Sequence, residues 1–326
     1  MTAPEILDAN DPSAITDAAA ILKAGELVSF PTETVYGLGA DAANARAVAK
    51  IYSAKGRPSF NPLIAHLADR DAAQRQGLFN TISIALADRF WPGPLTLVVP
   101  RSSTATVSDL ATAGLDSVAL RVPDNAVAHA LLSAFGGPVV APSANRSGYV
   151  SATTAQHVAT DLGDTVSIIL DAGPTGIGIE STVVDCTGET ARILRPGAVT
   201  RAAIREAIGD ALIEDNSATG DIVAPGMLAS HYAPNARVRL NAADVHPGEA
   251  VITISGFQPA GIEQAKAVFD LSPSGDLEEA AANLFTALRK LDEAASEGIA
   301  ICPIPEAGLG EAINDRLRRA AAPRDS

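Results

Sequence analysis

Short helix-like and strand-like segments alternate along the first two hundred or so residues, and this alternation is the strongest constraint on the fold. Residues 14–25, AITDAAAILKAG, carry apolar side chains at helical spacing and end at a glycine. The segment ELVSF follows at once and is typical of a buried strand. Similar segments recur through residues 45–67, 83–100, 125–142 and 153–173. Because the order is no regular strand-helix-strand repeat, we expect a twisted α/β sheet that is partly antiparallel.

The length and a change in composition predict two domains. A chain of 326 residues exceeds the usual size of one domain. Residues 213–236, IEDNSATGDIVAPGMLASHYAPNA, are rich in small, polar and proline residues and indicate a linker. A smaller set of helix-like and strand-like segments follows it, including the long helix-like DLEEAAANLFTALRKLDEAASEG.

Charge and hydropathy exclude some classes of protein. The formal net charge of −14 argues against a chain whose main task is to bind nucleic acid. No apolar run approaches the roughly 18 residues that a membrane span needs. The acidic start, MTAPEILDANDPSAITD, lacks the order of a signal peptide. We therefore expect a cytoplasmic protein without a membrane partner, in which Cys186 and Cys302 are buried free thiols.

A local concentration of positive charge stands out in this acidic chain. The segment SAKGRPSFNPL, residues 53–63, holds Lys55 and Arg57 two positions apart. Pro58 and Pro62 exclude a helix or central strand, so the sequence predicts a loop that follows a helix. An ammonium and a guanidinium held together suit a phosphate or carboxylate ligand, although a solvated surface loop is the alternative.

Two further polar segments follow buried strands, where open α/β sheets keep their ligands. Residues 30–41, FPTETVYGLGAD, place three polar side chains at a strand end, and Gly37 and Gly39 permit a tight turn or a close approach to a ligand. A plain strand-to-helix turn is the alternative there. Residues 141–154, APSANRSGYVSATT, supply short donors and acceptors for phosphate or ribose oxygens, with one threonine left to cap the next helix.

Several common signatures are missing from the sequence. It has no H-x-x-x-H, no C-x-x-C and no carboxylate cluster at ligand spacing, so no protein-held metal is predicted. It also lacks a Walker A loop, a G-x-S-x-G elbow and G-x-G-x-x-G. His66, in PLIAHL, shares a strand face with Ile64 by alternation and, taken alone, suits a core or edge position.

Five segments taken together resemble a known family. FPTETVYGLGA, KGRPSFNPL, APSANRSG, STVVD and LRPGAVT occur in this order over about residues 14–200 and resemble the YrdC-like domain. APGMLASHYAP, with the tail after it, resembles the two-domain form of the family, the L-threonylcarbamoyladenylate synthases. The resemblance implies a YrdC-like twisted, mixed, open sheet with helices in residues 1–205, a helix and linker in 206–236, and a smaller Rossmann-like α/β domain in 237–326.

The resemblance also implies a reaction. L-threonine, bicarbonate and ATP, accompanied by Mg²⁺, would give threonylcarbamoyl-AMP and pyrophosphate. That product would serve the downstream tRNA threonylcarbamoyl transferase machinery, which modifies the adenosine next to the anticodon. Direct binding of tRNA is left open by the resemblance, as are the oligomeric state and the group that accepts the proton of the threonine amine.

Site residues follow from the resemblance by motif. Lys55 and Arg57 match the catalytic K-x-R pair, which also contacts ATP. The positions that match L-threonine contacts are Thr34, His66, Arg121, Ser181 and, through its backbone, Ala141. The remaining positions that match nucleotide contacts are Asn61, Ser117, Ser143, Asn145, Ser151, Arg195 and Tyr232. For Arg121, in the apolar segment SVALRVP, an internal salt bridge is the alternative to a substrate carboxylate.

Three other classes of protein are weighed against this reading. A YrdC-like RNA-binding protein would not need adenylate synthesis, but the acidic balance and the 4% aromatic content speak against it. A related carbamoyl-adenylate enzyme of metalloprotein maturation would carry zinc-finger-like and acylphosphatase-like segments, which the sequence lacks. A protein scaffold would not need the four polar segments.

Overall fold

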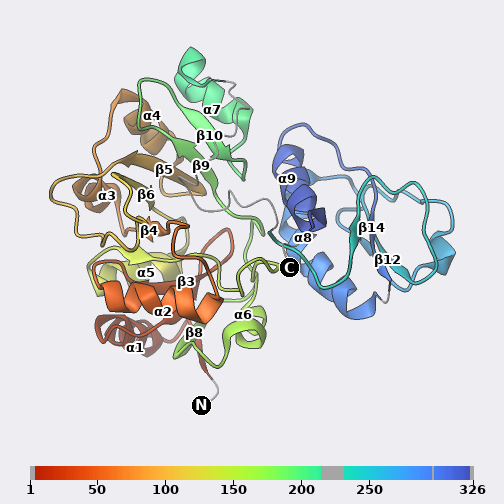
Figure 1. The fold of residues 1–326 in the computed structure, drawn as a ribbon, viewed down its shortest axis with the longest axis horizontal. Helices are drawn as coiled ribbons and strands as arrows, with labels where there is room; N and C mark the ends of the chain where they lie inside the picture. The colour runs from red at the N-terminus through yellow and green to blue at the C-terminus, as the bar shows by residue number, and fades with distance from the viewer. Residues whose placement is uncertain (1–3, 214–230, 296, 324–326) are drawn as a thin grey trace. The chain divides into compact units, whose positions relative to one another are not determined.

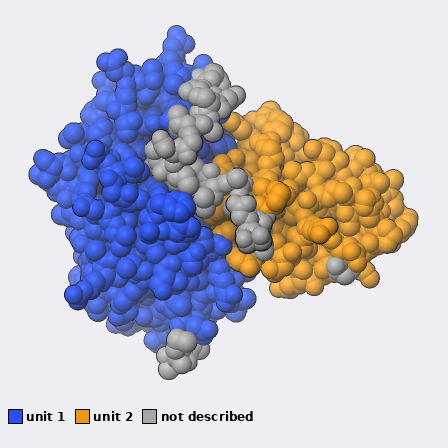
Figure 2. Space-filling model, in the orientation of Figure 1, with its two compact units in different colours: residues 1–147, 152–175, 180–227 blue, residues 148–151, 176–179, 228–326 orange. Residues whose placement is uncertain are grey.

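The computed structural model describes residues 4–213, 231–295 and 297–323 (Figure 1). The chain divides into two compact units (Figure 2). The first comprises residues 1–147, 152–175 and 180–227, and the second comprises 148–151, 176–179 and 228–326. Most of the predicted linker, 214–230, lies outside the described residues.

A ten-stranded sheet forms the centre of the first unit, and it confirms the prediction of a mixed α/β fold. In spatial order the strands are β1 (Glu5–Asp8), β8 (Ile168–Asp171), β2 (Val28–Pro31), β3 (Tyr36–Asp41), β7 (Val139–Val140), β4 (Ile64–His66), β6 (Ser117–Arg121), β5 (Leu95–Pro100), β9 (Thr182–Asp185) and β10 (Arg192–Arg195). The antiparallel pairs are β2–β3, β3–β7, β7–β4, β6–β5 and β9–β10. The parallel pairs are β1–β8, β8–β2, β4–β6 and β5–β9.

Helices in the first unit begin at side-chain caps that the sequence supplies. Asn44 accepts from two backbone N–H groups at the start of α2, and Gly56 ends that helix in the left-handed conformation. Thr154 caps α6 by accepting from the N–H of His157, as the sequence predicted. The α-helices described in this unit are α1 (Pro12–Lys23), α2 (Ala45–Lys55), α3 (Arg70–Gln76), α4 (Thr81–Phe90), α5 (Ala126–Phe135), α6 (Ala155–Leu162) and α7 (Arg201–Ile208).

The helices cover the two faces of this sheet unequally. The larger core joins α2, α3, α4, α6 and α7 to one face. On the opposite face, α1 and α5 pack on β8, β2 and β7. Farther along that face lies a small cluster made only of strand side chains, with Ile64, Val98, Ala119 and Val183 buried and Leu194 beside them. We call this part of the sheet the strand-only face, and it carries most of the polar side chains considered below.

The glycines of residues 30–41 do not form the tight turn that the sequence suggested. Gly37 and Gly39 lie inside β3, which forms an antiparallel hairpin with β2. A Cβ atom on Gly39 would lie 2.8 Å from the Phe30 ring, so the neighbour that this glycine approaches closely is the Phe30 ring. The alternative of a strand-to-helix turn is wrong as well, because a strand follows the loop.

The second unit has its own sheet, with described strands in the order β11 (Val238–Arg239), β14 (Gly298–Ile301), β12 (Glu249–Thr253) and β13 (Val268–Asp270). All of its strand pairs are parallel. Helices α8 (Leu277–Ala294) and α9 (Gly310–Ala321) belong to this unit, where Asp276 caps α8. The predicted second, smaller α/β domain is thereby confirmed.

Residues 148–151 and Tyr232 pack within the second unit. Arg289 of α8 donates to the carbonyl of Val150 at 2.5 Å and to that of Ser151 at 3.4 Å. Tyr232 is buried there between the ring of Phe285, 5.5 Å away, and the guanidinium of Arg316 at 5.3 Å. Both thiols, in their separate units, are free and buried, as the sequence predicted.

Candidate active site

Lys55 is the last residue of α2 and not a loop residue, and its ammonium is turned inward. Its Nζ donates to the Ser143 carbonyl at 2.6 Å and also to the Asn145 carbonyl, while the Ser147 N–H donates to the Lys55 carbonyl at 2.8 Å. Lys55 is 4% exposed. Burial first, and the charge of Arg57 second, hold the pKa of Lys55 well below its usual value. An anion bound beside it would raise this pKa again.

Arg57 stabilises the loop after α2 by hydrogen bonds to the backbone of the same loop. Its Nε donates to the Asn61 carbonyl at 3.3 Å and its Nη2 donates to the Pro62 carbonyl at 3.1 Å. The Asn61 side chain is fully buried, yet among the described residues neither atom of its amide has a hydrogen-bond partner. A buried amide without partners is costly, and such groups are characteristic of ligand sites.

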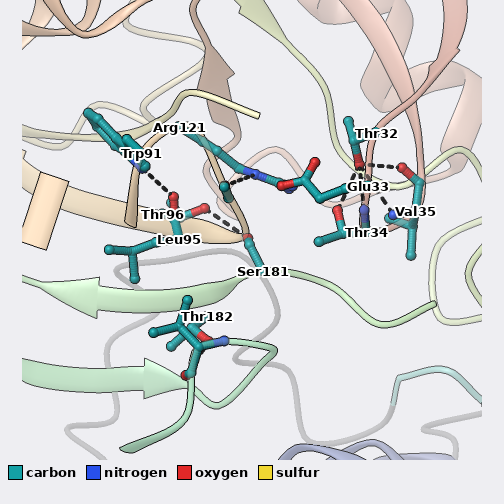
Figure 3. A network of polar contacts seen from close by, with 12 residues as sticks. Thr32, Glu33, Thr34, Val35, Trp91, Leu95, Thr96, Arg121, Ser181 and Thr182 are labelled. Atoms are coloured by element: carbon teal, nitrogen blue, oxygen red, sulfur yellow. Dashed lines mark hydrogen bonds and ion pairs between the residues drawn. The ribbon is translucent and has the colours of Figure 1, made fainter. Parts of the chain in front are cut away.

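Arg121 and His66 are register partners on the parallel strands β6 and β4, so both side chains lie on the strand-only face. Arg121 extends between two pairs of hydroxyls, those of Thr96 and Ser181 and those of Thr32 and Thr34 (Figure 3). Its Nε donates to the Gly93 carbonyl at 3.3 Å, and its Nη2 lies 2.7 Å from Oε1 of Glu33. Thr34, in the loop after β2, shares a 2.7 Å hydrogen bond with Thr32.

His66 is a neutral hydrogen-bonding group. Its Nδ1 lies 3.2 Å from the carbonyl oxygen of Ile64, and because a carbonyl only accepts, Nδ1 carries the hydrogen and Nε2 keeps a lone pair. Burial and the nearby charge of Arg121 lower the pKa of His66 to about 3. The ring also packs edge-on against Phe30. His66 is therefore an uncharged side chain at neutral pH.

This low pKa predicts a specific dependence of stability on pH. The unfolded state binds the His66 proton below its usual pKa of 6.5, whereas the folded state does not until about pH 3, so stability falls as the pH drops through this window. Between about pH 7.5 and pH 5 the free energy of unfolding should fall by about 2 kcal/mol more in the wild type than in His66→Gln. Urea unfolding followed by fluorescence of the single tryptophan, Trp91, reports on the first unit. Parallel pH dependences would contradict the prediction.

Ser181 is fixed just before β9 by groups from two other strands. Its hydroxyl lies 2.8 Å from that of Thr96, and Arg195 donates to the Ser181 carbonyl at 3.1 and 2.9 Å and to its hydroxyl at 3.2 Å. A register shift between Ile193 and Arg195 places Arg195 opposite Val183 and so on the strand-only face. Arg195 thereby orients Ser181.

Other residues assigned by the resemblance lie around these groups or apart from them. Ser143 pairs with Gly37 beside the β2–β3 hairpin, and Asn145 is buried two residues later. The Ala141 N–H donates to the Ile64 carbonyl at 3.1 Å. Ser117 begins β6 and so lies four residues from Arg121, at the end of the strand nearer Asn61. Ser151 and Tyr232 belong to the second unit.

Sequence reasoning gave no role to Glu33, Thr96 or Gly93, and the structure brings all three to Arg121 or Ser181. Thr96 lies two residues before Val98 in β5, so strand alternation could have placed it on the same face. Glu33 had only the signal of an acid inside the segment PTETV. Its partner Arg121 is 88 positions away, a pairing that local pattern does not reveal.

The charges of the site are mainly positive. In the described part of the first unit the buried basic side chains are Lys55, Arg57, Arg121 and Arg195. The buried or nearly buried acids close to these groups are Glu33 and Glu180, the residue before Ser181. No group of three or more metal-ligating side chains occurs among the described residues. Within the same residues, every helix is too short or too polar to cross a lipid bilayer.

The first unit is thus an α/β domain with a mixed sheet, whose buried basic side chains and hydroxyls are of the types that suit an anionic ligand. Comparison with known families makes the assignment specific. Residues 20–197 match the Sua5/YciO/YrdC family, described as Telomere recombination, and residues 199–322 match the family described as Threonylcarbamoyl-AMP synthase, C-terminal domain. The chain belongs to the Sua5/YciO/YrdC family, in its two-domain form.

Relatives in this family extend over nearly the whole chain. The threonylcarbamoyl-AMP synthase of Bacillus subtilis is 42% identical, over 98% of this chain and 95% of its own. That of Pyrococcus abyssi is 41% identical over 94% of each chain. The solved structure of P. abyssi Sua5 complexed with L-threonine is similar to this one, with a TM-score of 0.84, 39% identity and 94% of each chain covered.

Proposed function

We propose that this chain is a threonylcarbamoyl-AMP synthase that acts on L-threonine, bicarbonate and ATP. The observation that carries the proposal is the set of four buried basic side chains in the described part of the first unit. Arg121 and Arg195 lie on the strand-only face, whereas Lys55 ends α2 and Arg57 lies in the loop after it. Threonine carboxylate, carbamate and triphosphate would crowd negative charge into one site, and fixed cations offset it. The names of relatives at 41–42% identity and the L-threonine complex of P. abyssi Sua5 support the same reaction.

The amino acid is proposed to bind on the strand-only face. Arg121 would hold the α-carboxylate, because a guanidinium matches that group in shape and charge. Thr34 and Ser181 offer hydroxyls, and His66 offers a neutral acceptor, for the threonine hydroxyl. A site that pairs this hydroxyl rejects amino acids that lack it, because its own polar groups would then be left unpaired.

The nucleotide is proposed to bind along the edge formed by α2, its following loop and residues 141–147. Lys55 and Arg57 would face phosphate and carbamate, with Mg²⁺ arriving on the triphosphate as part of the substrate. Bicarbonate and the amine give the carbamate and water, and the carbamate then displaces pyrophosphate from the α-phosphate. The remaining nucleotide contacts proposed by resemblance are Asn61, Ser117, Ser143, Asn145, Ser151, Arg195 and Tyr232.

Orientation and charge can supply the catalysis without a covalent intermediate on the enzyme. The carbamate is short-lived, so the α-phosphate must already be aligned when it forms. The product is an activated acyl donor, and we propose that it serves threonylcarbamoylation of the tRNA adenosine next to the anticodon.

The test is pyrophosphate release by the full-length protein with MgATP and bicarbonate. We expect release to depend on both L-threonine and bicarbonate and to be much slower with serine or valine, each of which lacks one feature of the threonine side chain. Release that is absent, or indifferent to threonine, would overturn the proposal. Salt-dependent RNA retention under the same conditions would then favour the RNA-binding alternative.

A further inference from the structure

Glu33 and Arg121 form an ion pair in the interior of the site. Oε1 of Glu33 lies 2.7 Å from Nη2 of Arg121, and the two side chains are 13% and 4% exposed. The contact satisfies the distance of an ion pair but not the geometry of a hydrogen bond. Among the described residues, neither carboxylate oxygen of Glu33 has a hydrogen-bond partner, and Nη2 of Arg121 has none either.

This arrangement is incomplete as a structural ion pair. A buried carboxylate is normally stabilised by several donors, and attraction to one cation rarely offsets the loss of water around both charges. The hydroxyls of the neighbouring residues Thr32 and Thr34 do not supply the missing donors, because they bond to each other and Thr32 donates to the carbonyl of Val35. Both Glu33 oxygens therefore keep capacity for donors that a ligand brings.

The pair is complementary to one particular kind of ligand. An α-amino acid carries a carboxylate and an ammonium on a single carbon, so a cation and an anion in contact can meet both charges at once. Glu180, the other buried acid of the first unit near the site, carries a charge that partly offsets the lowering of the pKa of Lys55. Glu33 is the acid that lies beside Arg121.

We propose that Glu33 binds the α-ammonium of the amino-acid substrate and accepts its proton. The inference rests on the proposed function, because it assigns the second charge of the amino acid whose carboxylate Arg121 binds. One ammonium N–H proton moves to a Glu33 oxygen, and the N–H electron pair becomes the amine lone pair. This lone pair forms the N–C bond to bicarbonate carbon, water leaves, and Glu33 later returns its proton to solvent.

The first test compares two ligands that differ only at the ammonium. Calorimetry with the full-length protein would measure binding of L-threonine and of 2,3-dihydroxybutanoate of the same configuration, in which a hydroxyl replaces the ammonium. We expect the wild type to prefer threonine by roughly tenfold to a hundredfold, as for a hydrogen bond between charged groups. Equal affinities in the wild type would overturn the proposal without recourse to any variant.

The second test removes the charge of Glu33. Glu33→Gln should lose most of the preference for threonine and leave binding of the hydroxy acid nearly unchanged, whereas Glu33→Asp should keep part of the preference. Equal weakening of both ligands would mean that Glu33 only positions Arg121 and would overturn the proposal. Glu26→Gln is the matched control, because Glu26 is a half-exposed partner of Lys50 and the change in charge is the same.

The third test concerns the proton. At saturating threonine, kcat for pyrophosphate release by Glu33→Gln should fall roughly 10²- to 10⁴-fold, the range for loss of a general base. An unchanged kcat would overturn proton acceptance. If the wild type binds threonine with a Glu33-dependent preference but releases no pyrophosphate, the ammonium site stands and the proposed reaction falls.

Discussion

Lys55→Ala is expected to lower kcat for threonine-dependent pyrophosphate release by roughly 100- to 1,000-fold, the usual effect of removing one fixed group that stabilises developing negative charge. The Nζ of Lys55 is nearly buried and lies 2.6 Å from the carbonyl of Ser143, so the amino group that an anion would meet is already held in position. Burial lowers the pKa of Lys55, and an anion bound beside it would raise this pKa again.

Two variants separate charge from structure in this prediction. Lys55→Met keeps the length of the side chain without its charge, and it should lose as much activity as Lys55→Ala. Lys50→Ala is the matched control on the same helix, because Lys50 is half exposed and pairs with Glu26. It should retain nearly full activity, since such exposed pairs contribute little. Activity of Lys55→Met near that of the wild type would show that the charge is not needed.

The fold was predictable where local pattern and core burial agree. The alternating apolar segments predicted a mixed sheet, which the structure has. Asn44 and Gly56 mark the two ends of the helix that carries Lys55. The pattern failed at β3, where Gly37 and Gly39 suggested a turn but face the Phe30 ring and Ala141 inside a strand. Glycine permits both arrangements, and only the packing of a neighbouring strand decides between them.

The candidate site was predictable for residues that stand in recognisable segments and not for those that depend on pairing across the sheet. The residues from Lys55 to Asn61 form one short segment with an unusual composition. Glu33 and Arg121, by contrast, meet only because the loop after β2 reaches the face of β6. The position of Arg195 depends on a register shift, which alternation along a single strand does not show.

Gly197→Ala should both destabilise the first unit and weaken threonine binding, because this glycine lies against the backbone that presents Ser181. A Cβ atom at position 197 would come within 2.4 Å of the Thr182 nitrogen and 2.6 Å of the Glu180 oxygen. Backbone atoms cannot rotate away as a side chain can, so the segment leading into β9 must shift. Overpacking of this kind costs about 1–3 kcal/mol, and a displaced Ser181 hydroxyl would also lose its bond to Thr96.

The measurements are urea unfolding followed by the fluorescence of Trp91 and calorimetric titration with L-threonine. Gly188→Ala is the matched control, because Gly188 is exposed in the turn between β9 and β10 and a Cβ atom there would meet nothing within 4 Å. This control should stay within about 0.5 kcal/mol of the wild type, as surface substitutions do. If Gly197→Ala behaved like Gly188→Ala in both measurements, the strand end would be free to move, and Ser181 could not depend on a fixed backbone for its place beside Arg195.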